Sequence, residues 1–305
     1  MTGAGDVAPG RAPSVALFVT CVVDLVRPDA AVAAVALLRA AGSAVSCPTG
    51  QTCCGQPAWN AGFANEAAAV ARTSMEALER DPAEHVVVPA GSCATMIRRY
   101  WPQLFALAGR PGEAERAQRV AERTLELSEF LATPRPPTAR PDDARSSSSP
   151  PQGPVDDHSG QPDHGGEPEG GGLEGPGTLA YHRSCHLERE LHVTEQPTTL
   201  LTEATGMPPA PWGADDACCG FGGTFSVRLP EVSVAMADEK LNGLPAGVDT
   251  VVGCDASCLL HLEARARERG LSLRFRHLAE VLADHLDDPS DGAGPRAGRG
   301  GDPDG

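Results

Sequence analysis

Short apolar segments alternate with longer, alanine-rich segments along most of the chain. The short segments consist mainly of β-branched and aliphatic residues, as in HVVV at residues 85–88, and such runs are typical of buried strands. We predict strands at residues 14–20, 44–47, 85–88, 178–181, 250–253 and 272–275.

The longer segments carry the pattern of amphipathic helices. Ala71, Met75 and Leu78, for example, share one face at helical spacing, and Asn65 is a suitable N-cap for that helix. We predict helices at residues 28–41, 65–80, 94–108, 113–131, 196–204, 229–241 and 277–285. Strands that alternate with helices indicate an α/β fold, with a small parallel sheet and flanking helices in each half.

Residues 134–177 differ in composition from both halves. They consist mainly of Pro, Gly, Ser, Arg and acidic residues, with few large aliphatic side chains to bury. Such a segment cannot offset its ordering entropy, so we expect a disordered linker there. We also expect a disordered N-terminus at residues 1–13 and a disordered tail at 287–305. The two folded lobes should then span residues 14–133 and 178–286.

The cysteines repeat between the two halves. Four cysteines in each half share nearly the same spacing, and each set contains an adjacent pair followed by glycine. The offset between the sets is 164 residues at the first cysteine and 165 at the other three. The sets are Cys21, Cys53, Cys54 and Cys93, then Cys185, Cys218, Cys219 and Cys258. This repeat predicts two homologous lobes related by internal duplication.

The charge and hydropathy of the chain argue against several classes of protein. The chain has 41 acidic and 25 basic residues, a formal charge of −16, which argues against nucleic-acid and anionic-membrane partners. No apolar run is long enough to cross a bilayer, and residues 1–13 lack the apolar core of a signal peptide. We therefore expect a cytoplasmic protein without membrane insertion. In that reducing compartment, cysteines are more often metal ligands or redox groups than disulfides.

Four thiolates gathered from three loops suit a zinc ion, an iron–sulfur cluster or metal-free thiol chemistry. Zinc sites usually take ligands from closely spaced Cys pairs, and no such spacing occurs in the first half. The side chains of adjacent cysteines diverge, so they reach different irons of a cluster more easily than one ion. Gly55 and Gly220 allow the backbone to approach inorganic sulfide and to donate an N–H to it. We therefore favour iron–sulfur and keep zinc as an alternative.

The spacing of these cysteines resembles that of the cysteine-rich CCG-domain family, which includes the cysteine-rich subunit of heterodisulfide reductase and glycolate oxidase iron–sulfur subunits. Several local strings are similar to the lactate utilisation protein A family. They are FVTC (18–21), QTCCGQPAWNAG (51–62), PAGSC (89–93), CCGFGGTFSV (218–227) and SCLL (257–260).

The resemblance implies that the eight cysteines of the two sets bind iron–sulfur clusters of the [4Fe-4S] type. It also implies an electron-transfer subunit of a cytoplasmic complex that oxidises L-lactate to pyruvate. No flavin or nicotinamide motif is visible in the chain. The chain should therefore need a partner that carries such a group, and the resemblance implies that the partners are lactate utilisation proteins B and C, or equivalent iron–sulfur and flavin- or quinone-linked subunits.

The chain departs from its heterodisulfide reductase relatives at one position in each motif. Those proteins end each motif in Cys-x-x-Cys, whereas the first position of the pair is Ala90 in one half and Asp255 in the other. Asp255, or Cys254 beside it, is therefore a candidate extra ligand in the second set. His182 precedes Cys185 closely and is a candidate hydrogen-bond donor to cluster sulfur.

Two other functions remain open. One is a heterodisulfide-reductase-like thiol–disulfide reductase or a glycolate-oxidase-type subunit, which would keep the cluster and change the reaction. The other is a zinc-stabilised scaffold without a redox role. No catalytic residue can be assigned from the spacing.

Overall fold

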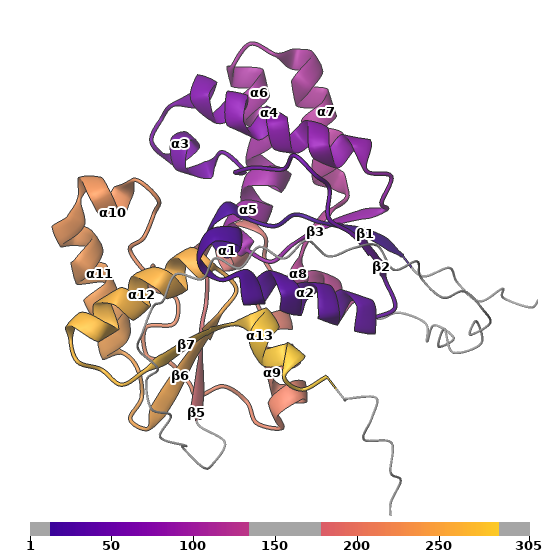
Figure 1. Cartoon of the computed structure of the whole chain (residues 1–305). Coiled ribbons are helices and arrows are strands. Elements are labelled where there is room, and N and C mark those ends of the chain that lie inside the picture. The colour runs from indigo at the N-terminus through magenta and orange to yellow at the C-terminus, as the bar shows by residue number, and fades with distance from the viewer. Residues whose placement is uncertain (1–12, 134–177, 287–305) are drawn as a thin grey trace, which may run out of the picture.

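The computed structural model describes residues 13–133 and 178–286, which form two lobes (Figure 1). Each lobe combines one parallel sheet with helices, so the predicted α/β fold is confirmed. The predicted linker at 134–177, the predicted tail at 287–305 and residues 1–12 of the predicted N-terminal segment lie outside the described residues.

The first lobe contains a four-stranded sheet in the order β2-β1-β3-β4. All of its pairings are parallel, and the register places Val15 between Val45 and His85. The strands are β1 (Ser14–Leu17), β2 (Ala44–Ser46), β3 (His85–Val88) and β4 (Thr124–Glu126). Because the strands are parallel, the loops that follow them converge at one edge of the sheet.

Helices connect these strands and cover the sheet. The longest, α4, buries the predicted apolar face that includes Ala71, Met75 and Leu78. The helices are α1 (Cys21–Val26), α2 (Pro28–Ala40), α3 (Gln56–Asn60), α4 (Ala64–Arg80), α5 (Gly91–Thr95), the π-helical turn η1 (Met96–Tyr100), α6 (Trp101–Leu107), α7 (Pro111–Glu122) and α8 (Leu127–Ala132).

The second lobe contains a three-stranded parallel sheet in the order β5-β6-β7. Its strands are β5 (Thr178–His182), β6 (Val248–Gly253) and β7 (Arg274–His277). A single parallel bridge joins Ala180 of β5 to Ala210. This bridge lies where β2 lies in the first sheet, so the two sheets share one topology.

The second lobe has fewer helices than the first among the described residues. No counterpart of α6 and α7 separates β6 from β7, where α12 alone makes the connection. The helices are the π-helical turn η3 (His186–Glu190), α9 (Gln196–Thr205), α10 (Phe225–Arg228), α11 (Pro230–Asn242), α12 (Ala256–Glu268) and α13 (Leu278–Ala283).

The lobes contact each other through reciprocal pairs of equivalent elements. Helix α2 packs against α13, and its counterpart α9 packs against α8. Likewise α5 packs against η3, and its counterpart α12 packs against α1. These are the contacts that a pseudo-two-fold relation between duplicated lobes produces. Figure 1 shows α2, α8, α9 and α13 where the lobes meet.

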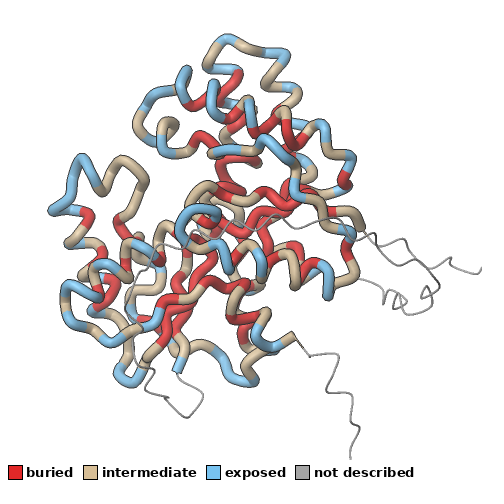
Figure 2. The backbone as a smooth tube through the Cα atoms, viewed as in Figure 1, coloured by how far each residue is buried: buried red, intermediate tan, exposed pale blue. Residues whose placement is uncertain are grey.

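One apolar cluster belongs to both lobes. It contains Leu17, Leu38 and Leu127 from the first lobe, and Leu201 and Leu278 from the second. Buried backbone is continuous from one sheet to the other in Figure 2. A separate cluster lies between β1, β3 and helices α4 and α6 of the first lobe, and another lies under α12 in the second.

Several local predictions are wrong, among them the strand expected at residues 14–20, which ends at Leu17. The helix expected at residues 113–131 is interrupted by β4, because Thr124–Glu126 pairs with β3 at the edge of the sheet and this tertiary pairing outweighs helix propensity. The N-cap of α4 is Phe63, so Asn65 lies inside the helix. The last strand lies at Arg274–His277 rather than at residues 272–275, and it ends where His277 caps α13.

Candidate metal centres

The cysteines of the first set lie beyond the carboxyl ends of β1, β2 and β3. Cys21 begins α1, Cys53 and Cys54 lie in the loop that follows β2, and Cys93 lies in α5. Their sulfur atoms form one contiguous group. The Sγ atoms of Cys54 and Cys93 are 3.2 Å apart, and Cys53 accepts hydrogen bonds from the thiols of Cys21 and Cys54.

The loop that carries the adjacent pair is held by its backbone. Gly55 has φ 89°, and a Cβ atom there would lie 2.8 Å from the carbonyl oxygen of Ala67 in α4. Trp101 Nε1 donates to the carbonyl oxygen of Cys54 at 2.8 Å, and Ser74 Oγ accepts from the Thr52 amide at 2.8 Å. The glycine is therefore required for close packing of this loop on α4.

The second set repeats this arrangement. Cys185 precedes η3, Cys258 lies in α12, and the adjacent pair lies in the loop before α10. The Sγ atoms of Cys219 and Cys258 are 3.0 Å apart, and Cys218 accepts hydrogen bonds from the thiols of Cys185 and Cys219. The glycine is again constrained: Gly220 has φ 88°, and a Cβ atom would lie 2.5 Å from the Ser233 carbonyl oxygen.

Hydrogen bonding concentrates negative charge on one sulfur in each set. Bonds from neighbouring thiols, with a further bond from the Gly55 amide at 3.4 Å, hold the pKa of Cys53 far below its usual range. Cys218 has a lowered pKa for the same reason, with the Gly220 amide at 3.4 Å. The pKa values of Cys21 and Cys185 are raised because each thiol donates to its neighbour.

Each set therefore offers four sulfur donors from three loops, with backbone N–H groups directed at one of them. Thiolates are the ligands of zinc, copper(I) and iron–sulfur clusters, whereas magnesium and calcium prefer oxygen. The donor atoms fit a thiophilic metal ion or an iron–sulfur cluster. In such a site the cysteines would supply the metal ligands and the two glycine amides would hydrogen-bond to sulfur.

The structure places the two candidate extra ligands in the contact between the lobes. One oxygen of Asp255 accepts bonds from the amide and hydroxyl of Ser92, at 3.0 and 2.5 Å, and the other accepts from Ser184 Oγ. Cys254 is fully buried, and its Sγ lies 3.1 Å from the hydroxyl of Tyr181.

His182 lies against the second set. One of its ring nitrogens and the Sγ atoms of Cys219 and Cys258 all lie within 4.8 Å of one another. The side chain is 1% exposed, and neither ring nitrogen has a hydrogen-bond partner among the described residues. Burial, together with the nearby Lys240 cation, lowers the pKa of His182 to about 3, so the imidazole is neutral.

Lys240 is not among the site residues predicted from the sequence. It is fully buried, and Nζ donates to the carbonyl oxygens of Ala214, Asp215 and Ala217 in the segment before Cys218. The ammonium group also lies 4.8 Å from the centre of the Trp212 ring. It is the only lysine in the chain, and that rarity is the one signal in the sequence that could have drawn attention to it.

Side chains next to the two sets meet across the lobe contact. Gln56, directly after the first Cys-Cys-Gly, donates from Nε2 to the Ser92 carbonyl oxygen at 3.0 Å. The same Nε2 lies 3.3 Å from His186 Nε2, and His186 Nδ1 lies 3.7 Å from Cys185 Sγ. The two cysteine sets are thus linked by a short path of polar side chains.

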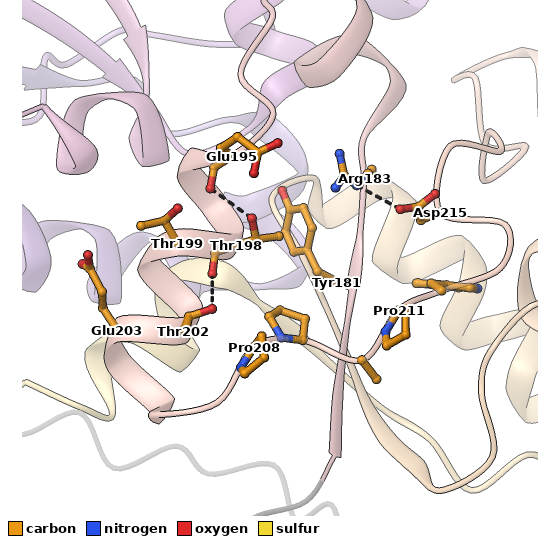
Figure 3. A pocket seen from close by; sticks show the side chains of 13 residues that line it. Tyr181, Arg183, Glu195, Thr198, Thr199, Thr202, Glu203, Pro208, Pro211 and Asp215 are labelled. Carbon is orange, nitrogen blue, oxygen red and sulfur yellow. Dashed lines mark hydrogen bonds and ion pairs between the residues drawn. The ribbon is translucent and has the colours of Figure 1, made fainter.

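Two of the cavities that border the second lobe are lined by residues of its cysteine-bearing loops. One, of about 570 Å³, contains no cysteine in its lining, and Figure 3 shows Arg183 there paired with Asp215. The other, of about 560 Å³, is lined by Cys218 and Gly220 together with Asn60 of the first lobe. The second cavity gives access to the second cysteine set from the boundary between the lobes, so it is the cavity relevant to this site.

The chain is similar to known proteins over most of its length. The cysteine-rich (CCG) domain family model matches residues 15–98 and 179–263, one copy in each lobe. Lactate utilization protein A of Exiguobacterium is 37% identical over 271 residues, which cover 88% of this chain and 97% of the relative. The proteins of the same name from Anoxybacillus flavithermus and Geobacillus kaustophilus are 38% and 37% identical, over 88% of this chain and 98% of each relative.

This chain belongs to the lactate utilization protein A family. The resemblance inferred from the cysteine spacing is therefore confirmed, and the double match of the family model agrees with the duplicated sheets. Within the two described ranges, no helix has the length and apolar character needed to cross a bilayer.

Proposed function

We propose that this member of the lactate utilization protein A family is the iron–sulfur electron-transfer subunit of a cytoplasmic system that oxidises L-lactate to pyruvate. The observation that supports it best is the gathering of two equivalent sets of four sulfur atoms, each from three loops of one lobe. The names of the relatives, which cover most of the chain, supply the lactate connection.

Each cysteine set would hold one cluster, of the [4Fe-4S] type, and a bound cluster would accept and pass on single electrons. Oxidation of lactate to pyruvate releases two electrons and two protons. Partner subunits equivalent to lactate utilisation proteins B and C, with iron–sulfur and flavin- or quinone-linked centres, would carry out the carbon chemistry and take up the electrons. The chain's own residues would bind the clusters, donate N–H groups to sulfur and limit access of water.

Purification without oxygen, with iron and sulfide counts, tests the proposal directly. We expect iron and sulfide for two clusters and a paramagnetic signal after reduction. Cys53→Ser should remove one centre and Cys218→Ser the other, while Cys47→Ser, at an exposed cysteine outside both sets, should remove neither. A preparation without iron and sulfide would contradict the proposal.

Deletion of the gene tests whether the protein takes part in the oxidation of L-lactate. The deletion strain should fail to grow on L-lactate when no other lactate dehydrogenase is present, and the wild-type gene should restore growth. Growth of the deletion strain at the wild-type rate would separate the protein from lactate oxidation even if its clusters are present.

A zinc site is the second candidate, and the group His182, Cys219 and Cys258 favours it at the second set only. A mixed histidine and cysteine set is a common zinc ligand group. Metal analysis of the Cys53→Ser variant, which keeps only the second set intact, distinguishes the two cases. Zinc without iron or sulfide would support a structural role for the second set.

A further inference from the structure

The two lobes differ at one buried position beside the cysteines. His182 ends β5 and precedes Cys185 by three residues, and Phe18 precedes Cys21 by the same interval after β1. Both side chains are buried, at 1% and 0% exposed. The duplicated fold thus places an imidazole in one lobe where the other has a hydrocarbon ring.

The imidazole of His182 lacks polar partners. Neither ring nitrogen has a hydrogen-bond partner among the described residues, and the ring contacts Trp212 edge-on with 6.2 Å between ring centres. Burial of a polar group without a partner is unfavourable, so such groups usually mark a missing partner. A phenylalanine in this place, as at the equivalent position 18 of the first lobe, would leave no polar group without a partner.

The position of the ring identifies the missing partner. A ring nitrogen of His182 lies within 4.8 Å of the Sγ atoms of both Cys219 and Cys258, which are themselves 3.0 Å apart. A group bound by these sulfur atoms would be the nearest polar neighbour of the imidazole. Neutral imidazole is also the commonest metal ligand among protein side chains, because one ring nitrogen keeps a lone pair.

The surroundings of His182 differ from those of Phe18 in two further respects. Gly253 pairs with His182 in the sheet, and a Cβ atom there would lie 3.5 Å from Cδ2 of the ring, whereas the first lobe has Val88 at the equivalent position. The second lobe also buries Lys240, where the equivalent position in α4 is Ser74. The second lobe thus combines an imidazole without polar partners among the described residues, a glycine packed against its ring and a buried cation.

We propose that His182 is a nitrogen ligand of the metal group in the second cysteine set, and that the two centres of this protein are therefore chemically different. The first centre would have four cysteine ligands, whereas in the second the imidazole would bind one iron in place of one of the four cysteines, because each iron of a [4Fe-4S] cluster takes a single protein ligand. This inference rests on the proposed function, because it takes the cysteine sets to hold iron–sulfur centres. Imidazole ligands raise the reduction potential of such centres. The second centre is then reduced more easily than the first, which gives electron flow within the protein a direction.

The test uses the full chain with the first centre removed by Cys53→Ser and Cys54→Ser, purified without oxygen and reconstituted with iron and sulfide. Pulsed electron paramagnetic resonance of the reduced second centre should show a nitrogen coupled as strongly as a direct ligand. Production with ¹⁵N-labelled histidine should change that coupling to the ¹⁵N pattern. His182→Phe, which copies Phe18, should abolish the coupling and shift the reduction potential downward. The matched control, with Cys218→Ser and Cys219→Ser, keeps the first centre and should show no strongly coupled nitrogen.

The outcomes separate this inference from the proposed function. A second centre with full iron and sulfide but no strongly coupled nitrogen would overturn the ligand role of His182 and leave the proposed function intact. Absence of iron and sulfide from both sets would overturn the proposed function. The labelling experiment needs no substitution at position 182 and shows whether a histidine is a ligand. His186→Phe, at the histidine whose Nδ1 lies 3.7 Å from Cys185 Sγ, should keep the coupling, and its loss in that variant would overturn the assignment to His182.

Discussion

The glycine after each adjacent cysteine pair is the most constrained residue of each site. Gly55 and Gly220 both adopt positive φ, and a Cβ atom on either would collide with a carbonyl oxygen of the following long helix. Their amides also donate to Cys53 and Cys218. One residue therefore sets the path of the loop and the charge of the nearest sulfur.

Substitution of Gly55 by alanine should destabilise the protein and loosen the first centre. Positive φ costs an alanine roughly 1–2 kcal/mol, and the clash with the Ala67 carbonyl oxygen should add about 1–3 kcal/mol. Gly62→Ala is the matched control, because Gly62 has φ 84° but no atom within 4 Å of its Cβ position. Denaturant unfolding of both variants measures the difference, and equal losses would show that the clash is relieved.

Glu126 is a buried carboxyl group in the contact between the lobes. It caps α8 by accepting from the Ser128 amide at 2.6 Å, and it is 1% exposed. Burial raises its pKa from the ordinary value of 4.5 to about 7 despite these hydrogen bonds. The folded protein therefore binds the proton of Glu126 more tightly than the unfolded chain does.

This shift predicts that stability depends on pH in a defined direction. Because the folded-state pKa is raised, the stabilisation that protonated Glu126 contributes is fully present below pH 4.5. It is lost as pH rises to about 7. The free energy of unfolding of the wild type, relative to Glu126→Gln, should fall by about 3 kcal/mol across this window. Denaturant unfolding of both proteins between about pH 4 and 8 measures this difference in the free energy of unfolding. If the two free energies change with pH in parallel, Glu126 does not have the raised pKa.

At the scale of elements, the loops after β3, β5 and β6 meet at Asp255. Its carboxylate joins Ser92 of α5 to Ser184 in the loop after β5. His277, the N-cap of α13, adds a second link, because Nε2 lies 2.8 Å from the Cys254 carbonyl oxygen and 3.1 Å from that of Pro89. The loops that carry cysteines are thus anchored to the opposite lobe.

Removal of the Asp255 carboxylate should weaken this contact. Asp255→Ala leaves the donors of half-buried Ser92 and buried Ser184 without their acceptor, at a cost of about 2–4 kcal/mol. Asp255→Asn keeps one oxygen acceptor and should lose less. Thermal or denaturant unfolding compares the two. Retention of wild-type stability by the alanine variant would show that Asp255 does not hold the lobes together.

At the scale of the whole molecule, the shared apolar core couples the two lobes. Leu38 lies in a cluster that also contains Leu201 and Leu282 of the other lobe. Neither lobe can unfold without exposing part of this cluster to water. We therefore expect both lobes to unfold in one cooperative transition.

The tryptophans allow this coupling to be measured. Trp101 is buried in the first lobe and Trp212 in the second, so variants that retain one or the other report on each lobe. Leu38→Ala should lower the unfolding midpoint of both reporters equally, with a loss of about 2–5 kcal/mol. Val32→Ala, on the exposed face of α2, should change neither. Separate midpoints for the two reporters would show that the lobes unfold independently.

The repeat, the fold class and the family resemblance could all be predicted from the amino-acid sequence. Two cysteine sets at nearly equal offsets identify a duplication, and runs such as HVVV identify buried strands, because both signals depend on residues near one another in the chain. The strings around Cys53 and Cys218 carry the family resemblance in the same local way.

The contacts between distant residues became visible in the three-dimensional structure. It interrupted the expected helix at 113–131 with β4, since pairing with β3 depends on a distant segment. It directed the Asp255 carboxylate to serines of both lobes, and it left the imidazole of His182 beside two cysteine sulfurs without another polar partner among the described residues. Spacing along a chain records local geometry, whereas the environment of a buried polar group is set by residues that fold against it from elsewhere.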